Sequence, residues 1–115
     1  MRHNFRELIS WKVSFDLVKD VYVISKQLPD DEKFGLKNQI QRCAISIPSN
    51  IAEGSGRTTD KEFIYFLYVA ISSAYELETQ LLICEDLFEV DVNELVAKLE
   101  NIQRLIGGLK RKLTN

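Results

Sequence analysis

The sequence contains few cysteine, proline, glycine and histidine residues. Among 115 residues there are two cysteines, two prolines, five glycines and one histidine, His3. Two thiols and one imidazole are too few ligands for a structural zinc site, and Cys43 and Cys84 fall in apolar helical patterns where reduced packing residues are expected. The scarcity of proline and glycine leaves long uninterrupted segments, which suit helices better than short strands. We therefore predict no metal or other cofactor.

Long hydrophobic segments are also absent. The longest apolar run, FIYFLYVAI at residues 63 to 71, is far shorter than the roughly 20 residues that a membrane-spanning helix needs. The first residues do not have the basic and apolar pattern of a secretory leader. We therefore expect a cytoplasmic protein without membrane contact. With 45% hydrophobic residues, the chain can form one core in a single domain over residues 1–115.

The sequence has no recognisable catalytic arrangement. It contains no glycine-rich phosphate loop, no activated serine or thiol arrangement and no metal-ligand spacing. Its acidic residues are spread over surface faces or helix-capping positions. The sequence therefore predicts a protein that is not an enzyme and has no catalytic residues.

What the sequence does contain is apolar residues at steps of three and four in four segments, which predicts four helices. The residue types at the ends of these segments favour helix starts and stops. The predicted boundary residues are Pro29 after the first helix, Asp31 or Glu32 and then Gly54 or Gly56 around the second, Thr59 with Glu62 before the third, and Asp91 with Glu94 before the fourth. Short connections between helices of about 20 residues, each about 30 Å long, favour an all-α, antiparallel up-down-up-down four-helix bundle.

Each predicted helix has an apolar row that suits a bundle core. The first helix has two such rows, Leu8, Trp11, Phe15, Val18, Tyr22 and Leu17, Val21, Ile24, Leu28. The rows of the other helices are Leu36, Ile40, Cys43, Ile47, Ile51, then Phe63, Leu67, Ala70, Ala74, Leu77, Leu81, Cys84, and finally Leu95, Leu99, Ile102, Ile106, Leu109, Leu113.

The segment SIPSNIAEG, residues 46 to 54, places a proline inside the second apolar row. Pro48 has no amide hydrogen to donate to the carbonyl of Ala44, and its ring crowds that carbonyl. The apolar steps nevertheless continue to Ile51. We therefore expect a helix that is kinked at Pro48 and continues to Gly54, with a break at Ser46 as the alternative.

Polar residues form a strip beside this second apolar row. They are Gln39, Ser46, Asn50 and Glu53. The strip is either a binding surface or a structural network that satisfies the kink and fixes the helix register, and we favour the structural interpretation.

The third helix has a second apolar row in addition to its core row. It consists of Ile64, Tyr68, Ile71, Tyr75 and Leu82. A helix that is apolar on two faces is buried on two sides, and exposed contiguous apolar surface marks an interface. This row therefore predicts a homo-oligomer interface; the alternative is that the aromatic residues widen a single core face.

The net charge of −2 conceals an uneven distribution of charge. In the antiparallel topology, residues 1 to 12, 53 to 62 and 104 to 115 gather at one end, with nine basic and four acidic residues. Residues 26 to 33 and 85 to 94 gather at the other end, with two basic and eight acidic residues. At the basic end the candidate phosphate contacts are Arg57, Lys110, Arg111 and Lys112. The alternative is that they only complement the C-terminus of the fourth helix.

Two long stretches of the sequence are distinctive, FGLKNQIQRCAISIPSNIAEGSGR at residues 34 to 57 and KEFIYFLYVAISSAYELETQL at residues 61 to 81. Together with Trp11 and Pro29, they resemble a bacterial protein family, the 23S ribosomal RNA intervening-sequence proteins. Many members carry Gly-Ser where this chain has Ser72 and Ser73. Members are four-helix bundles similar to the accessory protein of diversity-generating retroelements, a homopentamer that binds nucleic acid and a reverse transcriptase. The resemblance thus implies a homopentameric four-helix bundle.

These features together predict a non-enzymatic oligomeric binding module that binds RNA or DNA weakly through its basic end. A protein-protein scaffold or adaptor, with another protein as its partner and no nucleic-acid binding, is the alternative.

Overall fold

The computed structural model describes residues 3–114 of the chain. Its elements are η1 (Phe5–Glu7), α1 (Ile9–Ser25), η2 (Asp30–Glu32), α2 (Leu36–Ser55), α3 (Asp60–Phe88) and α4 (Asn93–Thr114), where η marks a short 3-10 helix. No strand occurs in the described range, and the four long helices pack together. The predicted all-α four-helix-bundle class is therefore confirmed.

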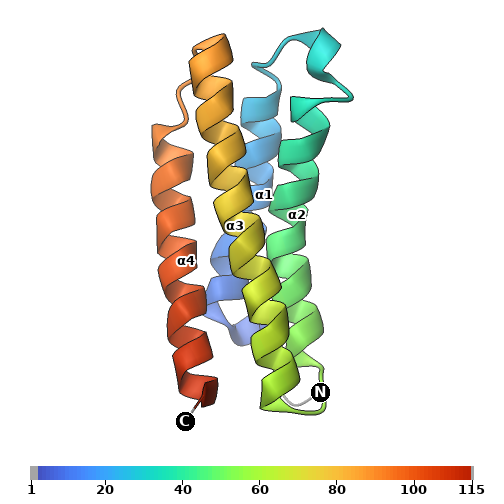
Figure 1. Cartoon of the computed structure of the whole chain (residues 1–115), viewed down its shortest axis with the longest axis vertical. Helices are drawn as coiled ribbons and strands as arrows, with labels where there is room; N and C mark the ends of the chain where they lie inside the picture. Colours follow the sequence, from blue (N-terminus) through green and yellow to red (C-terminus); the bar gives the residue numbers. More distant parts are fainter. Residues whose placement is uncertain (1–2, 115) are drawn as a thin grey trace.

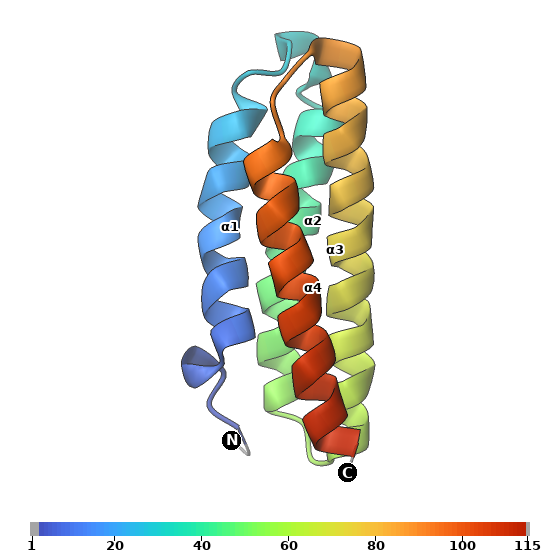
Figure 2. The ribbon, with the colours of Figure 1, turned by 90° about the vertical axis from the view of Figure 1, so that its left-hand side faces the viewer.

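The helices form an elongated bundle that measures 44 × 22 × 19 Å. Helix α1 contacts α2 and α4, and α3 contacts the same two neighbours, so α1 and α3 lie diagonally opposite. In Figure 1 the chain runs toward the top of the view along α1 and α3 and toward the bottom along α2 and α4. Figure 2 shows η1, the α2–α3 turn and the end of α4 at one end of the bundle, and η2 with the α3–α4 connection at the other.

The start of α2 lies further along the chain than the sequence predicts. Asp31 and Glu32 do not open this helix but belong to the 3-10 helix η2, and α2 begins at Leu36. The Glu32 carboxylate explains the difference, because its Oε1 accepts a hydrogen bond from the Leu36 amide at 3.2 Å. Glu32 therefore satisfies a free amide of the first turn from outside the helix. At the start of α3, by contrast, Thr59 Oγ1 accepts from the Glu62 amide at 3.2 Å, as its capping position predicts.

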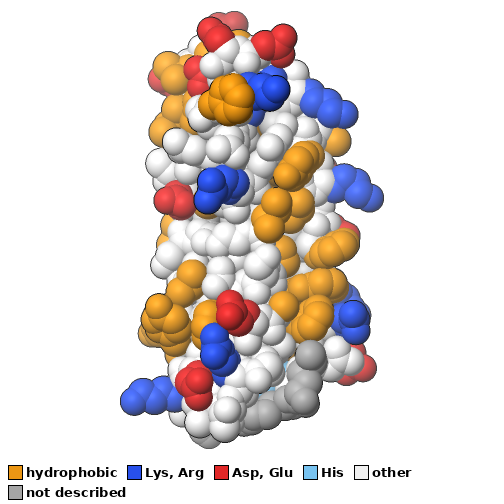
Figure 3. Space-filling model, turned by 90° about the vertical axis from the view of Figure 1, so that its right-hand side faces the viewer, with side chains coloured by type: hydrophobic (Ala, Val, Ile, Leu, Met, Phe, Trp, Pro, Cys, Tyr) orange, Lys and Arg blue, Asp and Glu red, His pale blue; other side chains and the backbone are white. Residues whose placement is uncertain are grey.

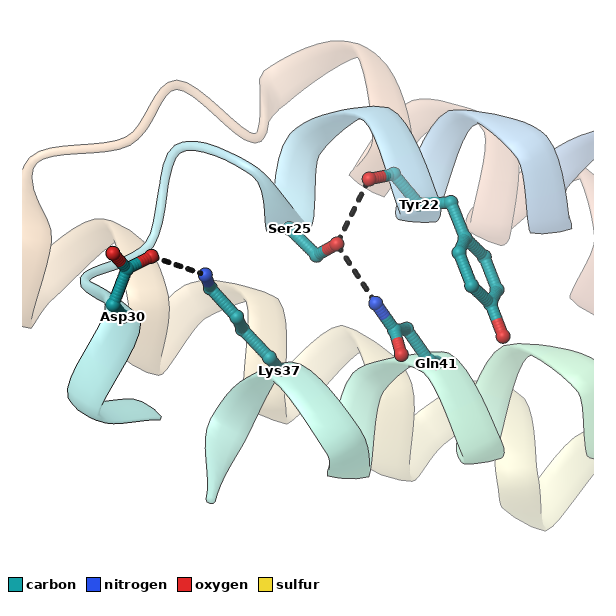
Figure 4. A network of polar contacts seen from close by, with 5 residues as sticks. All are labelled: Tyr22, Ser25, Asp30, Lys37 and Gln41. Atoms are coloured by element: carbon teal, nitrogen blue, oxygen red, sulfur yellow. Dashed lines mark hydrogen bonds and ion pairs between the residues drawn. The ribbon is translucent and has the colours of Figure 1, made fainter. Parts of the chain in front are cut away.

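Polar contacts hold the end of α1 against the start of α2 (Figure 4). The Ser25 hydroxyl donates to the Tyr22 carbonyl at 2.8 Å and accepts from Gln41 Nε2 at 3.0 Å. Lys37 Nζ lies 3.4 Å from Asp30 Oδ1, which ties η2 to α2. These bonds set the relative height of α1 and α2.

The two apolar rows of α1 differ in burial. The row Leu17, Val21, Ile24, Leu28 is buried, as are most core rows of the other helices. In the row that includes Trp11, however, Phe15 is 57% exposed and Tyr22 is 40% exposed. The buried positions in the first turns of α1 belong instead to Ser10 and Ser14. Small side chains there let α1 approach its neighbours. Phe15 and Tyr22 face outward, while Leu8, Trp11 and Val18 of the same row pack against the edge of the core.

Helix α2 runs without interruption through Pro48, so the alternative of a break at Ser46 is wrong. The kink at Pro48 stays a prediction. The helix ends at Ser55, and Gly56 is its C-cap, in agreement with a glycine stop at this point.

Gly54 lets the end of α2 approach α3 closely. A Cβ atom added at Gly54 would lie 2.8 Å from ring carbon Cδ1 of Phe63 and 2.8 Å from Cβ of Phe66. The Phe66 Cβ is fixed to the backbone and cannot rotate away. We therefore expect Gly54→Ala to destabilise the bundle by about 1–3 kcal/mol, because overpacking outweighs the gain of about 1 kcal/mol in helix propensity. The midpoint of urea unfolding measures this effect.

Gly108→Ala is the matched control for this prediction. A Cβ there would lie 3.8 Å from Arg111, an ordinary contact, so this change should stabilise helix α4 by up to about 1 kcal/mol. Equal stabilisation by both substitutions would contradict the close approach at Gly54.

Candidate interaction surfaces

The fold brings the sequence-predicted basic segments to one end of the molecule. η1, the α2–α3 turn and the C-terminal turns of α4 all lie there (Figure 2). Arg2, which was counted with this end, lies outside the described residues. The acidic segments around η2 and the α3–α4 connection lie at the opposite end, so the bundle has a charge gradient along its long axis.

Arg57 is engaged by neighbours of its own chain. Its Nη2 donates to Glu53 Oε1 at 3.1 Å, and its guanidinium carbon lies 4.5 Å from the centre of the Phe66 ring. The ion pair thus joins Arg57, a candidate phosphate-binding residue, to Glu53 of the predicted polar strip. Since Glu53 offsets its charge and Phe66 covers one side of it, Arg57 is the least available of the four candidate cations.

The other three candidates lie on the last turns of α4. Lys110 Nζ lies 3.9 Å from the centre of the Tyr68 ring. A candidate phosphate-binding residue of α4 is thus in contact with a residue of the predicted interface row on α3. Arg111 and Lys112 are exposed. Lys112 also lines a hollow of about 350 Å³ between the start of α1 and α4, together with Arg104, which belongs to the basic end but not to the predicted set.

Three members of the polar strip lie in the seam between α2 and α3. Ser46 Oγ and Ser73 Oγ are 2.8 Å apart, and Asn50 Nδ2 donates to the Ser46 carbonyl at 2.8 Å. Gln80 Nε2 donates to Gln39 Oε1 at 3.4 Å. Glu53, the fourth member, pairs with Arg57 instead. The Ser46–Ser73 bond joins α2 to α3 close to Pro48, the Asn50–Ser46 bond lies within α2, and the Gln80–Gln39 bond joins the two helices further toward the start of α2.

The Cys43 thiol lies in the same seam. Its Sγ lies 3.1 Å from the Ser73 carbonyl oxygen and 3.3 Å from Glu76 Oε1, so its single hydrogen is shared between these two acceptors. Burial, and then the hydrogen bond and negative charge of Glu76, raise the pKa of Cys43 to about 12. Burial also raises the pKa of Cys84, and Glu32 adds to this effect. Both thiols therefore stay protonated at neutral pH.

We expect both cysteines to resist alkylation in the folded protein. A pKa raised from 9.0 to about 12 lowers the thiolate fraction of Cys43 about 1000-fold near neutral pH, and the thiolate is the reactive form. Iodoacetamide labelling followed by mass spectrometry should therefore be slow at pH 8 and should reach the ordinary rate only after unfolding in urea. A labelling rate of the native protein that levels off near pH 9 would contradict the raised pKa.

The predicted interface row of α3 is divided between core and surface. Ile64 and Ile71 are half-buried, and Ile71 packs against the core. Tyr68, Tyr75 and Leu82 are exposed, with Tyr75 at 55%. The row borders α4, where Lys110 covers Tyr68. Widening of the core accounts for Ile71 but not for Tyr68 and Tyr75, which are exposed outside the core.

Sequence reasoning missed an apolar groove on the opposite side of the bundle. It is a hollow of about 490 Å³ between η1, α1 and α2, lined by Phe5, Trp11, Phe15, Asp16, Val18, Lys19, Ile45, Pro48, Ser49 and Ala52. The Trp11 ring centre lies 5.1 Å from that of Phe5 and 4.9 Å from that of Phe15. Figure 3 views the molecule from the α2 side and shows hydrophobic side chains in a broken column along this face. The sequence signal for this groove was the α1 row that contains Trp11, Phe15 and Val18. The apolar pattern alone could not show that part of this row is exposed.

Two further observations bear on the class of protein. No helix between residues 3 and 114 is long and apolar enough to cross a membrane. In the same range, no group of three or more His, Cys, Asp or Glu residues is placed to hold a metal ion.

Taken together, the fold and surfaces define a small all-α bundle with apolar outer faces and one basic end. The family model of the 23S rRNA-intervening sequence proteins matches residues 6–108, so the chain belongs to this family. The comparison with curated proteins found no significant match.

Proposed function

We propose that this chain is a non-enzymatic homo-oligomer that binds RNA or single-stranded DNA weakly and without sequence preference. The binding surface is the basic end of the bundle. The observation that carries the proposal is the meeting of η1, the α2–α3 turn and the end of α4 at one end, where basic residues outnumber acidic ones (Figure 2). Arg104, Arg111 and Lys112 are the exposed cations that contact phosphates in this proposal.

Oligomerisation strengthens this contact. One subunit offers only a few cations, and a few phosphate contacts give weak binding. If subunits stand side by side with the same polarity, their basic ends form one ring-shaped surface with several times as many cations. A pentamer, as implied by the family resemblance, multiplies the contacts fivefold. Phosphate contacts of this kind position a nucleic acid but do not read its sequence.

The test is a salt titration with the intact assembly. The assembly state is first measured by light scattering, and binding of labelled mixed-sequence RNA and single-stranded DNA is then followed by fluorescence anisotropy. At about 50 mM salt we expect measurable binding, and for 6–10 phosphate contacts a loss of about 10³–10⁵ in affinity by about 200 mM salt. Absence of binding at low salt by an assembled sample would reject the proposal.

The exposed apolar groove favours one second candidate function, a protein-protein scaffold without nucleic-acid binding. An assembled protein that binds neither RNA nor DNA would support this candidate instead.

A further inference from the structure

The bundle carries two different apolar surfaces on opposite sides. The groove lies between α1 and α2, and the exposed part of the α3 row borders α4. Because α1 and α3 are diagonal in the bundle, the α1–α2 side and the α3–α4 side face away from each other. Neither surface can cover the other within one molecule.

The two surfaces lie at the same height along the bundle axis. The hydrogen bond between Ser46 of α2 and Ser73 of α3 places these residues at one level. The groove residue Pro48 is two residues from Ser46, about 3 Å along the helix. The row residues Ile71 and Tyr75 are each two residues from Ser73. A copy moved sideways, with no shift along the axis, would therefore bring the row to the level of the groove.

The shapes of the two surfaces are also complementary. The groove is hollow and lined by Trp11 and Phe15, whereas Tyr68 and Tyr75 are exposed side chains on a helix. The groove lining carries one acidic and one basic residue, Asp16 and Lys19, so it has no net charge that would repel Lys110, which lies over Tyr68 in the row. Tyrosine suits such a contact because its ring is buried while its hydroxyl can stay at the rim.

We propose that the α1–α2 groove receives the α3 row of a second copy of this chain. This inference rests on the homo-oligomer of the proposed function and names the surface that receives the row. The contact joins two different surfaces, so it is heterologous and repeats from one subunit to the next. Matching heights mean that the repeat has no step along the axis, which gives a closed ring rather than a helical filament. All basic ends then lie on one face of the ring.

A mixing experiment with two single variants tests the heterologous contact. Phe15→Glu places a carboxylate in the groove and leaves the row intact, while Tyr75→Glu does the reverse. A carboxylate buried without a partner disfavours the contact, so each variant alone should be monomeric. An equimolar mixture should form a dimer of one copy of each, because the intact row of one fits the intact groove of the other and both remaining surfaces are blocked. Light scattering and native mass spectrometry with one isotope-labelled variant identify this species.

Controls make each outcome decisive. Val23→Glu alters an exposed apolar residue of α1 that does not line the groove and should assemble as the wild type does. If circular dichroism shows that Phe15→Glu is unfolded, Ile45→Glu replaces it, because Ile45 is an exposed lining residue on α2.

Full assembly of either groove variant, or a mixture that stays monomeric although both variants fold, would overturn the inference. Those results would not contradict the proposed homo-oligomer. A monomeric wild-type protein, by contrast, would reject both the homo-oligomer and the contact between groove and row. Nucleic-acid binding by the wild-type assembly is measured separately and does not depend on which surfaces join.

Discussion

Tyr75→Glu should convert the assembled protein to monomers without unfolding the bundle. Tyr75 is 55% exposed, so the substitution removes little from the core of one subunit. In the proposed assembly the same position is covered by another copy, and a carboxylate buried there without a partner would cost several kcal/mol at every contact. Gel filtration with light scattering measures the mass, and the far-ultraviolet circular dichroism should stay near that of the wild type.

Tyr68→Glu is a weaker form of this experiment. Lys110 Nζ lies 3.9 Å from the centre of the Tyr68 ring and could pair with the new carboxylate. The charge would then be partly compensated, so assembly should be weakened less than by Tyr75→Glu. Leu87→Glu is the matched control on α3, because Leu87 is exposed but lies outside the row. An assembly that tolerates Tyr75→Glu, or one that Leu87→Glu disrupts equally, would argue against a specific role of the row.

The helices could be predicted from the sequence because their signals are local and redundant. Long apolar rows and few helix breakers define four segments, and Thr59 marks the start of α3 through a bond within its own first turn. The start of α2 was misplaced because acidic residues favour any helix N-terminus. Whether Glu32 sits inside the first turn or caps it from η2 depends on the path after Pro29, which no periodicity encodes.

The surfaces were harder to predict because they depend on how the helices are rotated. In α1 the row with Trp11 and Phe15 is only partly buried, with Phe15 exposed, and the buried positions include Ser10 and Ser14. A sequence pattern shows two rows but not which one faces the neighbouring helices. The packing of Arg57 on Phe66 was hidden for a related reason, since Phe66 comes from a different helix, whereas the pair with Glu53 has the i,i+4 spacing that a sequence can show.

Replacing Lys110, Arg111 and Lys112 together with glutamine should weaken nucleic-acid binding and flatten its dependence on salt. Each lost phosphate contact lowers the salt slope by about one, and the loss is repeated in every subunit that touches the nucleic acid. Lys110 contributes less than the other two where it remains over the Tyr68 ring. Glutamine retains good helix propensity, so α4 should stay intact. Fluorescence anisotropy at several salt concentrations gives the affinity and the slope from the same titrations.

Arg57→Gln is the sharpest comparison for the triple variant, because the structure separates it from the other candidates. Its guanidinium already pairs with Glu53 at 3.1 Å and packs on Phe66, so its removal should leave the salt slope nearly unchanged. Lys33→Gln, at the acidic end, should change neither slope nor affinity and controls for the loss of overall positive charge. Light scattering must show that all variants keep the assembly, since a monomer would lose affinity for a different reason. An intact triple variant that keeps the wild-type slope would remove α4 from the binding surface, and a large effect of Arg57→Gln would mean that the ion pair with Glu53 opens when nucleic acid binds.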